Sequence, residues 1–169
     1  LGAKRVILAR ELSLKQIEEI RNAVPDIELE CFVHGSQCMS YSGRCLLSDY
    51  MTGHERKANH GGCAQPCRWS YKLLEETRPG EYYEIVEDEK GSHILSPKDL
   101  CLVRFADDLR NIGVNSIKVE GRTKSLYYVS AVSKAYREVL DGKISADDGF
   151  MELLKVGNRG YTNGFFLGD

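Results

Sequence analysis

The chain has 169 residues, of which 42% are apolar and 28% are charged, and its formal net charge is −2. This composition excludes disordered and collagen-like chains and predicts one ordinary globular domain. The balanced charge excludes nucleic-acid binding by overall basicity and leaves local basic patches for that role. No apolar run reaches the roughly 18 residues of a membrane span, and no signal-peptide pattern is visible, so we expect a soluble, cytoplasmic protein.

The start of the chain is unusual, because the first residue is Leu1 and a short apolar run, residues 6–8, follows almost at once. We therefore expect a piece of a longer protein whose amino-terminal half is absent. An open strand edge at residues 6–8 would then favour self-association. A capping box at residues 13–16 next predicts a helix, which Pro25 ends.

The following segment, residues 27–34, alternates apolar and polar side chains and so predicts a strand. This alternation places Cys31 in the core and puts Glu30 and His34 together on the other face. The periodicity then stops, and residues 35–72 form an irregular insert that is rich in Gly, Ser, His and Cys.

The rest of the chain returns to regular patterns. Two short apolar runs within residues 82–95 predict a small hairpin, and the Ser-Pro pair that opens residues 96–113 predicts a helix there. A strand is predicted at residues 116–119 and a long helix at residues 126–140. Residues 143–169 are a separate carboxy-terminal tail segment, whose Gly- and aromatic-rich part we expect to be an ordered loop.

The order of these elements predicts an α/β fold with at least three parallel strands in residues 1–142. Three strands rarely close a sheet, so we interpret them as the carboxy-terminal part of a β/α (TIM-like) barrel with a Cys-rich insert and a small β-hairpin. In such a barrel, the segments after Val33 and Val119 leave the carboxyl ends of strands and line the functional mouth.

Six cysteines are many for a cytosolic chain, and four of them, Cys38, Cys45, Cys63 and Cys67, lie in the insert. Clustered thiolates are typical ligands of soft metal centres, namely zinc or an iron–sulfur cluster. Structural zinc sites usually have two tight Cys pairs, whereas only Cys63 and Cys67 are close in sequence here, which favours the cluster. Zinc and incidental thiols stay open alternatives on the residues alone.

Much of the chain consists of distinctive blocks: ECFVHGSQC (30–38), GRCLLS (43–48), CAQPCRW (63–69), SPKDL (96–100) and IKVEGRTKS (117–125). Together these blocks resemble the peptidase U-32 family, the collagenase-like peptidases. The tail block NRGYTNGF (158–165) is most similar to the branch of bacterial tRNA hydroxylation proteins in that family, which help to make 5-hydroxyuridine at the wobble position of tRNA.

The resemblance implies a barrel catalytic domain, a 4Fe-4S cluster, and prephenate as the oxygen source, so that tRNA and prephenate are the expected partners. Carried over to this chain, the resemblance makes Cys38, Cys45, Cys63 and Cys67 the cluster ligands. Cys101 is the reserve ligand, because some relatives replace the last cysteine with a later one.

The candidate catalytic residues are Glu30, His34 and Glu120, which lie at or near predicted strand ends. Each has a structural alternative. His34 is equally suited to be a core histidine, and Glu30 to be the ion-pair partner of a barrel lysine. Glu120 is also suited to a salt bridge with Arg122 that caps the last strand.

The candidate substrate-binding residues are basic and suit the carboxylates of prephenate or the phosphates of tRNA: Arg44, Lys118, Arg122 and Lys124. Arg44 alternatively neutralises the negative charge of a thiolate cluster. Trp69 lies beside basic residues and is a candidate for stacking on RNA bases, or else packs at the edge of the insert.

Two other functional classes compete with an iron–sulfur enzyme of tRNA hydroxylation, which is our interpretation. A collagenase-like peptidase is suggested by the family name, but no Gly-x-Ser-x-Gly elbow is present, and His54 and His60 do not have the spacing of a His-Glu-x-x-His zinc site. A cysteine protease would need an activated thiol, such as Cys38 with His34. The third class is a non-catalytic, metal-stapled binding module.

Overall fold

The computed structural model describes residues 2–38, 40–69, 72–74, 77, 80, 82–84, 98–122 and 124–168. The chain divides into two compact units. Unit 1 consists of Leu1–Gln37 and Lys98–Asp169, and unit 2 consists of Cys38–Pro97. Among the described residues, no helix is both long and apolar enough to cross a membrane.

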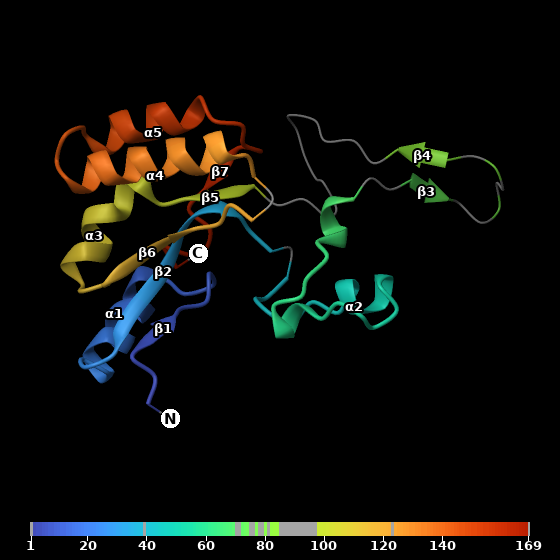
Figure 1. Cartoon of the computed structure of the whole chain (residues 1–169), viewed down its shortest axis with the longest axis horizontal. Helices are drawn as coiled ribbons and strands as arrows, with labels where there is room; N and C mark the ends of the chain where they lie inside the picture. Colours follow the sequence, from blue (N-terminus) through green and yellow to red (C-terminus); the bar gives the residue numbers. More distant parts are fainter. Residues whose placement is uncertain are drawn as a thin grey trace. The chain divides into compact units, whose positions relative to one another are not determined.

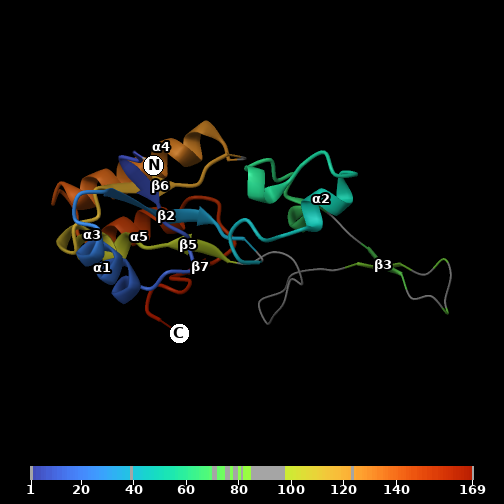
Figure 2. The same cartoon turned by 90° about the horizontal axis from the view of Figure 1, so that it is seen from below.

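Unit 1 is a sheet with helices packed on it (Figure 1 and, from below, Figure 2), so the predicted mixed α/β class is confirmed. Its strands are β1 (Arg5–Ile7), β2 (Glu28–Ser36), β5 (Asp99–Cys101), β6 (Ser116–Val119) and β7 (Tyr161–Thr162). Its helices are α1 (Leu14–Ala23), the 3-10 turn η3 (Val103–Phe105), α3 (Ala106–Asn111), α4 (Leu126–Leu140) and α5 (Ala146–Leu154).

Strand β2 is the centre of this sheet. It pairs in parallel with β1 and with β6, which confirms the prediction of three parallel strands. The end of β2 also pairs with β5, but antiparallel, and β5 in turn pairs in parallel with β7. The part of the tail that was expected to be a loop therefore contributes a short strand to the sheet.

The core of unit 1 lies between the sheet and the helices. Alternate residues of β2, namely Leu29, Cys31 and Val33, are at most 3% exposed and belong to one cluster with Val132 and Tyr136 of α4. The predicted core position of Cys31 is confirmed. Burial raises the pKa of its thiol to about 12, so Cys31 is a neutral, apolar side chain.

The helix signals read from the sequence have the expected physical basis at α1 and α4. The Oγ of Ser13 accepts a hydrogen bond from the Gln16 N–H at 3.3 Å, and the Gln16 Oε1 accepts one from the Ser13 N–H at 2.9 Å, which is the predicted capping box. The long helix occupies the predicted residues 126–140, capped by Ser125, whose Oγ accepts from the Tyr128 N–H.

The helix predicted for residues 96–113 is wrong in its first half. Residues Asp99–Cys101 form β5, and α3 begins only at Ala106. All three residues of β5 are buried, because the strand lies between β2 and β7, so sheet pairing and burial outweigh the local capping signal. Ser96 and Pro97 themselves lie outside the described residues.

The described residues of unit 2 contain only short regular elements. It contains α2 (Leu47–Met51), the 3-10 turns η1 (Ala58–His60) and η2 (Pro66–Arg68), and an antiparallel pair of strands, β3 (Lys72–Leu74) and β4 (Tyr82–Glu84). The hairpin predicted between residues 84–86 and 93–95 lies largely outside the described residues.

Candidate functional site

The carboxyl ends of β2 and β6 are fastened together. The Glu120 N–H donates to the His34 carbonyl oxygen at 2.8 Å. Gly35, at φ +107°, allows this approach, because a Cβ on that residue would lie 2.4 Å from the Glu120 carbonyl oxygen. The strand ends after Val33 and Val119, which the sequence assigned to one mouth, are therefore neighbours in unit 1.

A register shift separates two candidate residues that the sequence placed on one face. Phe32 pairs with Lys118, whereas His34 already pairs with Val119, so β2 carries one extra residue between them. The shift ends the simple alternation of β2. As a result, Glu30 and His34 contact different sets of side chains.

His34 is enclosed by aromatic rings. It is only 1% exposed, and its ring lies 5.9, 5.7 and 5.2 Å, centroid to centroid, from the rings of Tyr128, Tyr136 and Tyr161. Burial lowers the pKa of His34 to about 4, so the imidazole is neutral at neutral pH. Its Nε2 lies 3.5 Å from the Tyr161 hydroxyl, a long contact.

Beside this histidine lies a fully buried carboxylate, Asp99 of β5. Its Oδ1 accepts a hydrogen bond from Arg159 Nη2 at 2.8 Å, and its Oδ2 lies 3.5 Å from Lys124 Nζ. Burial alone would raise the pKa of Asp99, but Arg159 and Lys124 outweigh burial and hold this pKa below its usual value. Arg159 also donates to the Ser36 hydroxyl at 3.2 Å.

Glu30 is the hub of a polar network across the three parallel strands. Its carboxylate accepts hydrogen bonds from Lys118 Nζ at 3.0 Å, from Ser116 Oγ at 2.9 Å and from Arg5 Nη1 at 3.3 Å. The Lys118 hydrogen bond is the largest of the effects that lower the pKa of Glu30. Glu30, a candidate catalytic residue, is thus ion-paired with Lys118, a candidate substrate-binding residue. This arrangement is the structural alternative that the sequence offered for Glu30.

The two remaining candidates at this edge are Glu120 and Arg122. Glu120 Oε1 accepts a hydrogen bond from the backbone N–H of Arg122 at 2.8 Å, and Oε2 lies 3.6 Å from Arg10 Nη2. Glu120 therefore fixes the turn that follows β6. The side chain of Arg122 is exposed.

Unit 2 is organised around one buried serine. Ser48 is fully buried; its Oγ donates to the Arg56 carbonyl oxygen at 2.8 Å and accepts from the Ala64 N–H at 2.8 Å. Arg56 in turn donates to the carbonyl oxygens of Gly62 and Cys63. These bonds hold α2 against the segment that carries two of the predicted ligands.

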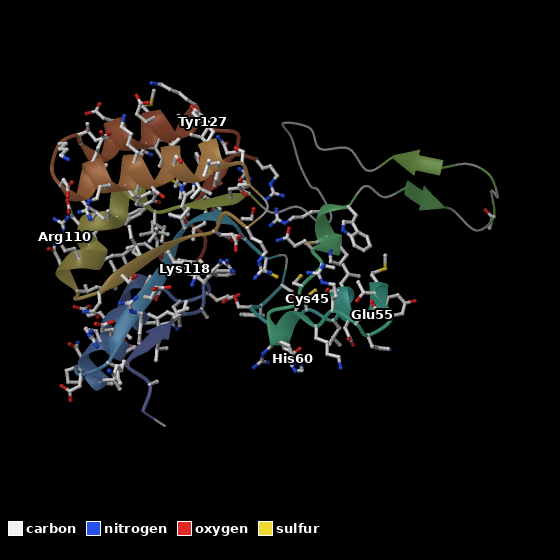
Figure 3. The ribbon with its side chains drawn as sticks, in the orientation of Figure 1. Cys45, Glu55, His60, Arg110, Lys118 and Tyr127 are labelled. Carbon is white, nitrogen blue, oxygen red and sulfur yellow. The ribbon has the colours of Figure 1, made fainter. Side chains whose placement is uncertain are left out.

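Three of the predicted ligand thiols lie near enough to the fourth, Cys67, to act on it electrostatically. Burial, and to a smaller extent the charges of Cys38, Cys45 and Cys63, raise the pKa of Cys67. The Sγ of Cys63 accepts a hydrogen bond from the Gln65 N–H at 3.3 Å. Figure 3 labels Cys45 among the sulfur atoms of unit 2.

All six cysteines are free thiols. Within the described part of the chain, no three His, Cys, Asp or Glu side chains converge closely enough to hold a metal ion as they stand. The four thiols are soft donors in one segment, which is the donor set that an iron–sulfur cluster or zinc requires. The ligand set Cys38, Cys45, Cys63 and Cys67 stays a prediction, and Arg44 beside it is exposed.

Sequence reasoning missed the polar cluster around His34. Asp99 was assigned to the first turn of a helix, and Tyr128 was not singled out within the predicted long helix. Arg159 and Tyr161 were recognised only as part of the tail block. The usable signal was the density of Arg, Tyr and Asn in that tail, which is more than a solvent-exposed loop requires.

Comparison with known proteins gives a consistent family. The model of peptidase family U32 matches residues 1–169. A tRNA hydroxylation protein P of Escherichia coli is 40% identical over 98% of this chain and 46% of its own length. An uncharacterized protease of Methanocaldococcus jannaschii is 45% identical over 99% of this chain and 42% of its own length.

A third relative is the 23S rRNA 5-hydroxycytidine C2501 synthase of Escherichia coli, 40% identical over 85% of this chain and 20% of its own length. The chain thus spans less than half the length of each of these curated relatives. No solved structure matches the chain.

Proposed function

The chain belongs to peptidase family U32, and from that membership we propose that it is part of an enzyme that hydroxylates the wobble uridine of tRNA to 5-hydroxyuridine. One observation carries the proposal. Two relatives that are each 40% identical to this chain are named for hydroxylation of RNA, one of tRNA and the other of a cytidine in 23S rRNA. Hydroxylation of RNA is the activity that these names share.

The finer fold proposal is that the three parallel strands are part of a β/α barrel, completed by a further half of the protein. The polar network of Glu30 supports it, because it links β1, β2 and β6 on one side of the sheet while Leu29 and Cys31 pack against helices on the other. The outer strand β1 has half-exposed Val6 and Ile7 and pairs in the described residues only with β2. An open edge of this kind is suited to a further strand or to self-association.

We assign the cofactor to unit 2. Cys38, Cys45, Cys63 and Cys67 would hold a 4Fe-4S cluster, with zinc as the alternative metal. The reserve ligand Cys101 is a buried core residue of β5 in unit 1, which favours Cys67 as the fourth ligand. Such a cluster supplies one-electron chemistry when bound. The Gln65 N–H would then donate to a ligand sulfur, since it already donates to Cys63 Sγ.

The proposed co-substrate is prephenate, the oxygen donor in this reaction. Its carboxylates require cations, and Lys124 beside Asp99 and the exposed Arg122 are at the β6 end of unit 1 where such an acid would bind. Trp69, which is 45% exposed, and Arg44 in unit 2 are available to the tRNA by stacking and by phosphate pairing.

The test is in vitro hydroxylation with anaerobically purified protein, unmodified tRNA and prephenate. Nucleoside mass spectrometry would measure 5-hydroxyuridine, and iron and sulfide analysis would give about four of each per chain if the cluster is present. The double variant Cys38→Ala, Cys45→Ala is expected to lose the iron and the product. Product formed without prephenate would disprove the assigned co-substrate, and zinc in place of iron would disprove the cluster.

A collagenase-like peptidase is the second candidate, because one relative is named a protease. Cleavage of gelatin by the same preparation, lost in the Cys38→Ala variant, would favour it over hydroxylation. A metal-stapled binding module predicts that tRNA is bound but neither modified nor cleaved.

A further inference from the structure

Three buried polar atoms around His34 lack hydrogen-bond partners. In the described residues, five buried side-chain oxygen and nitrogen atoms have no hydrogen bond, and three of them are His34 Nδ1, Tyr128 Oη and Asp99 Oδ2. An unsatisfied buried polar group costs free energy. Asp99 Oδ2 has the charge of Lys124 Nζ at 3.5 Å, so it is His34 Nδ1 and Tyr128 Oη that require an explanation. Such a cluster is typical of a site that a ligand completes.

The other two tyrosines around His34, Tyr136 and Tyr161, do have hydrogen-bond partners for their hydroxyls. The Tyr136 hydroxyl donates to the Val33 carbonyl oxygen at 2.7 Å and accepts from the Leu102 N–H at 3.1 Å. The Tyr161 hydroxyl donates to the Leu153 carbonyl oxygen at 3.0 Å. These two hydroxyls bond to the backbone, whereas the buried Tyr128 hydroxyl does not.

The charges of the cluster favour an anion. Lys124 and Arg159 bring two positive charges to the negative charge of Asp99, and Glu120, the other carboxylate that acts on Tyr128, is paired with Arg10. His34 and Tyr128 are neutral at neutral pH, because burial lowers the pKa of the first and raises that of the second. The side chains of Lys124 and Arg159 are 22% and 24% exposed, so the cluster reaches the surface at its cationic side. A ligand that enters there meets the cations first.

We propose that His34 Nδ1, Tyr128 Oη and Lys124 Nζ form a binding site for a small carboxylic acid that also carries a hydroxyl or carbonyl oxygen. Lys124 pairs with the carboxylate. The second oxygen of the ligand takes the hydrogen bonds that Tyr128 and His34 lack. This site deepens the proposed function, since prephenate has two carboxylates, a hydroxyl and a ketone, and it places that acid in unit 1.

Isothermal titration of the purified protein with three acids tests the chemistry. Prephenate and phenylpyruvate have a carboxylate and a further oxygen, whereas succinate has carboxylates only. We expect the first two to bind and succinate to bind at least about tenfold more weakly, the loss of one good hydrogen bond. Failure of both oxo acids to bind, or equal binding of succinate, would overturn the site.

The decisive variant is Tyr128→Phe, which removes one oxygen and keeps the ring. Prephenate affinity should fall about tenfold, without a loss of thermal stability, because the missing hydroxyl had no partner to lose. Tyr136→Phe should lower stability and leave affinity unchanged, and Tyr127→Phe, an exposed neighbour on α4 (labelled in Figure 3), should change neither. Unchanged prephenate affinity in Tyr128→Phe, the result expected if only a buried water fills the site, would overturn the proposal.

The tRNA assay separates this inference from the proposed function. If wild type hydroxylates tRNA and Tyr128→Phe does so with an unchanged KM for prephenate, the function stands and the site is wrong. If prephenate binds in a Tyr128-dependent way but no 5-hydroxyuridine forms, the site stands and the assigned reaction is wrong.

Discussion

The two units of this chain differ in what holds them together. Apart from Pro66, the buried apolar residues of the described chain belong to unit 1, where strands and helices share one core. Unit 2 buries only Ser48 and Pro66 among its described residues, and its cysteines form no disulfide. A small unit without an apolar core usually depends on a disulfide or a metal. The comparison therefore supports the assignment of the metal centre to unit 2 from packing, independently of the family.

The largest expected effect is loss of the proposed metal centre from unit 2. The variant Cys38→Ala, Cys45→Ala should lose all bound iron and become open to proteases within residues 38–97, because metal binding in small sites supplies on the order of 10 kcal/mol of folding free energy. Unit 1 should keep its melting temperature. Metal analysis and limited proteolysis with mass spectrometry measure these effects.

The matched control is Cys31→Ala in the core of unit 1. It should destabilise unit 1 by about 1 kcal/mol and keep the iron, since Cys31 contributes packing alone. Iron retained in the double variant, or lost in Cys31→Ala, would contradict the division of roles between the units.

The next effect is a pH dependence confined to unit 1. The folded pKa of His34, about 4, is below its value of 6.5 in an unfolded chain, although the facing Asp99 opposes this shift and Lys124 adds to it. Between these pH values only the unfolded state binds the proton. Stability is therefore full above pH 6.5 and falls by about 3 kcal/mol as the pH is lowered to 4.

Urea unfolding of unit 1 at several pH values between 4 and 7.5 measures this loss. His34→Gln should flatten the curve over that range, whereas His60→Gln, an exposed histidine of unit 2, should leave it unchanged. An equally steep curve in His34→Gln would assign the pH dependence to other groups.

A smaller effect is expected from a comparison of two of the tyrosines that surround His34. Tyr136→Phe removes a hydroxyl with two backbone hydrogen bonds and should lower the stability of unit 1 by about 1–2 kcal/mol. Tyr128→Phe should cost nothing, because its hydroxyl has no hydrogen bond within the described chain. Thermal melts of both variants test the difference, and equal losses would mean that Tyr128 has a partner that the geometry does not show.

The sequence predicted unit 1 well where one local signal decided the structure. The alternation of residues 27–33 and the caps at Ser13 and Ser125 were sufficient for β2, α1 and α4. The prediction from sequence failed where residues distant in the chain determine the structure. The capping signal before Asp99 lost to strand pairing, and the extra residue after Phe32 turned His34 away from Glu30.

The candidate site shows the same limit. The neighbouring ends of β2 and β6 followed from strand order, and an ion pair between Glu30 and a lysine of the sheet was among the alternatives. Asp99 and Arg159, by contrast, are 60 residues apart and meet only because β7 lies beside β5. No periodic pattern within either segment predicts the contact between Asp99 and Arg159.

The smallest effect compares a serine from each unit. Ser48→Ala removes the bonds from α2 to the Arg56 carbonyl oxygen and the Ala64 N–H. Because the described part of unit 2 has no apolar core, a loss of about 1–2 kcal/mol is expected to appear as faster loss of the proposed cluster's iron to a chelator. Ser13→Ala removes the cap of α1, which should cost unit 1 about 1 kcal/mol and leave the iron in place. Chelation rates and thermal melts of the two variants should therefore show opposite patterns. If Ser48→Ala releases iron no faster than wild type, the four thiols and the metal hold unit 2 by themselves, and the hydrogen bonds of Ser48 only follow the shape that the metal imposes.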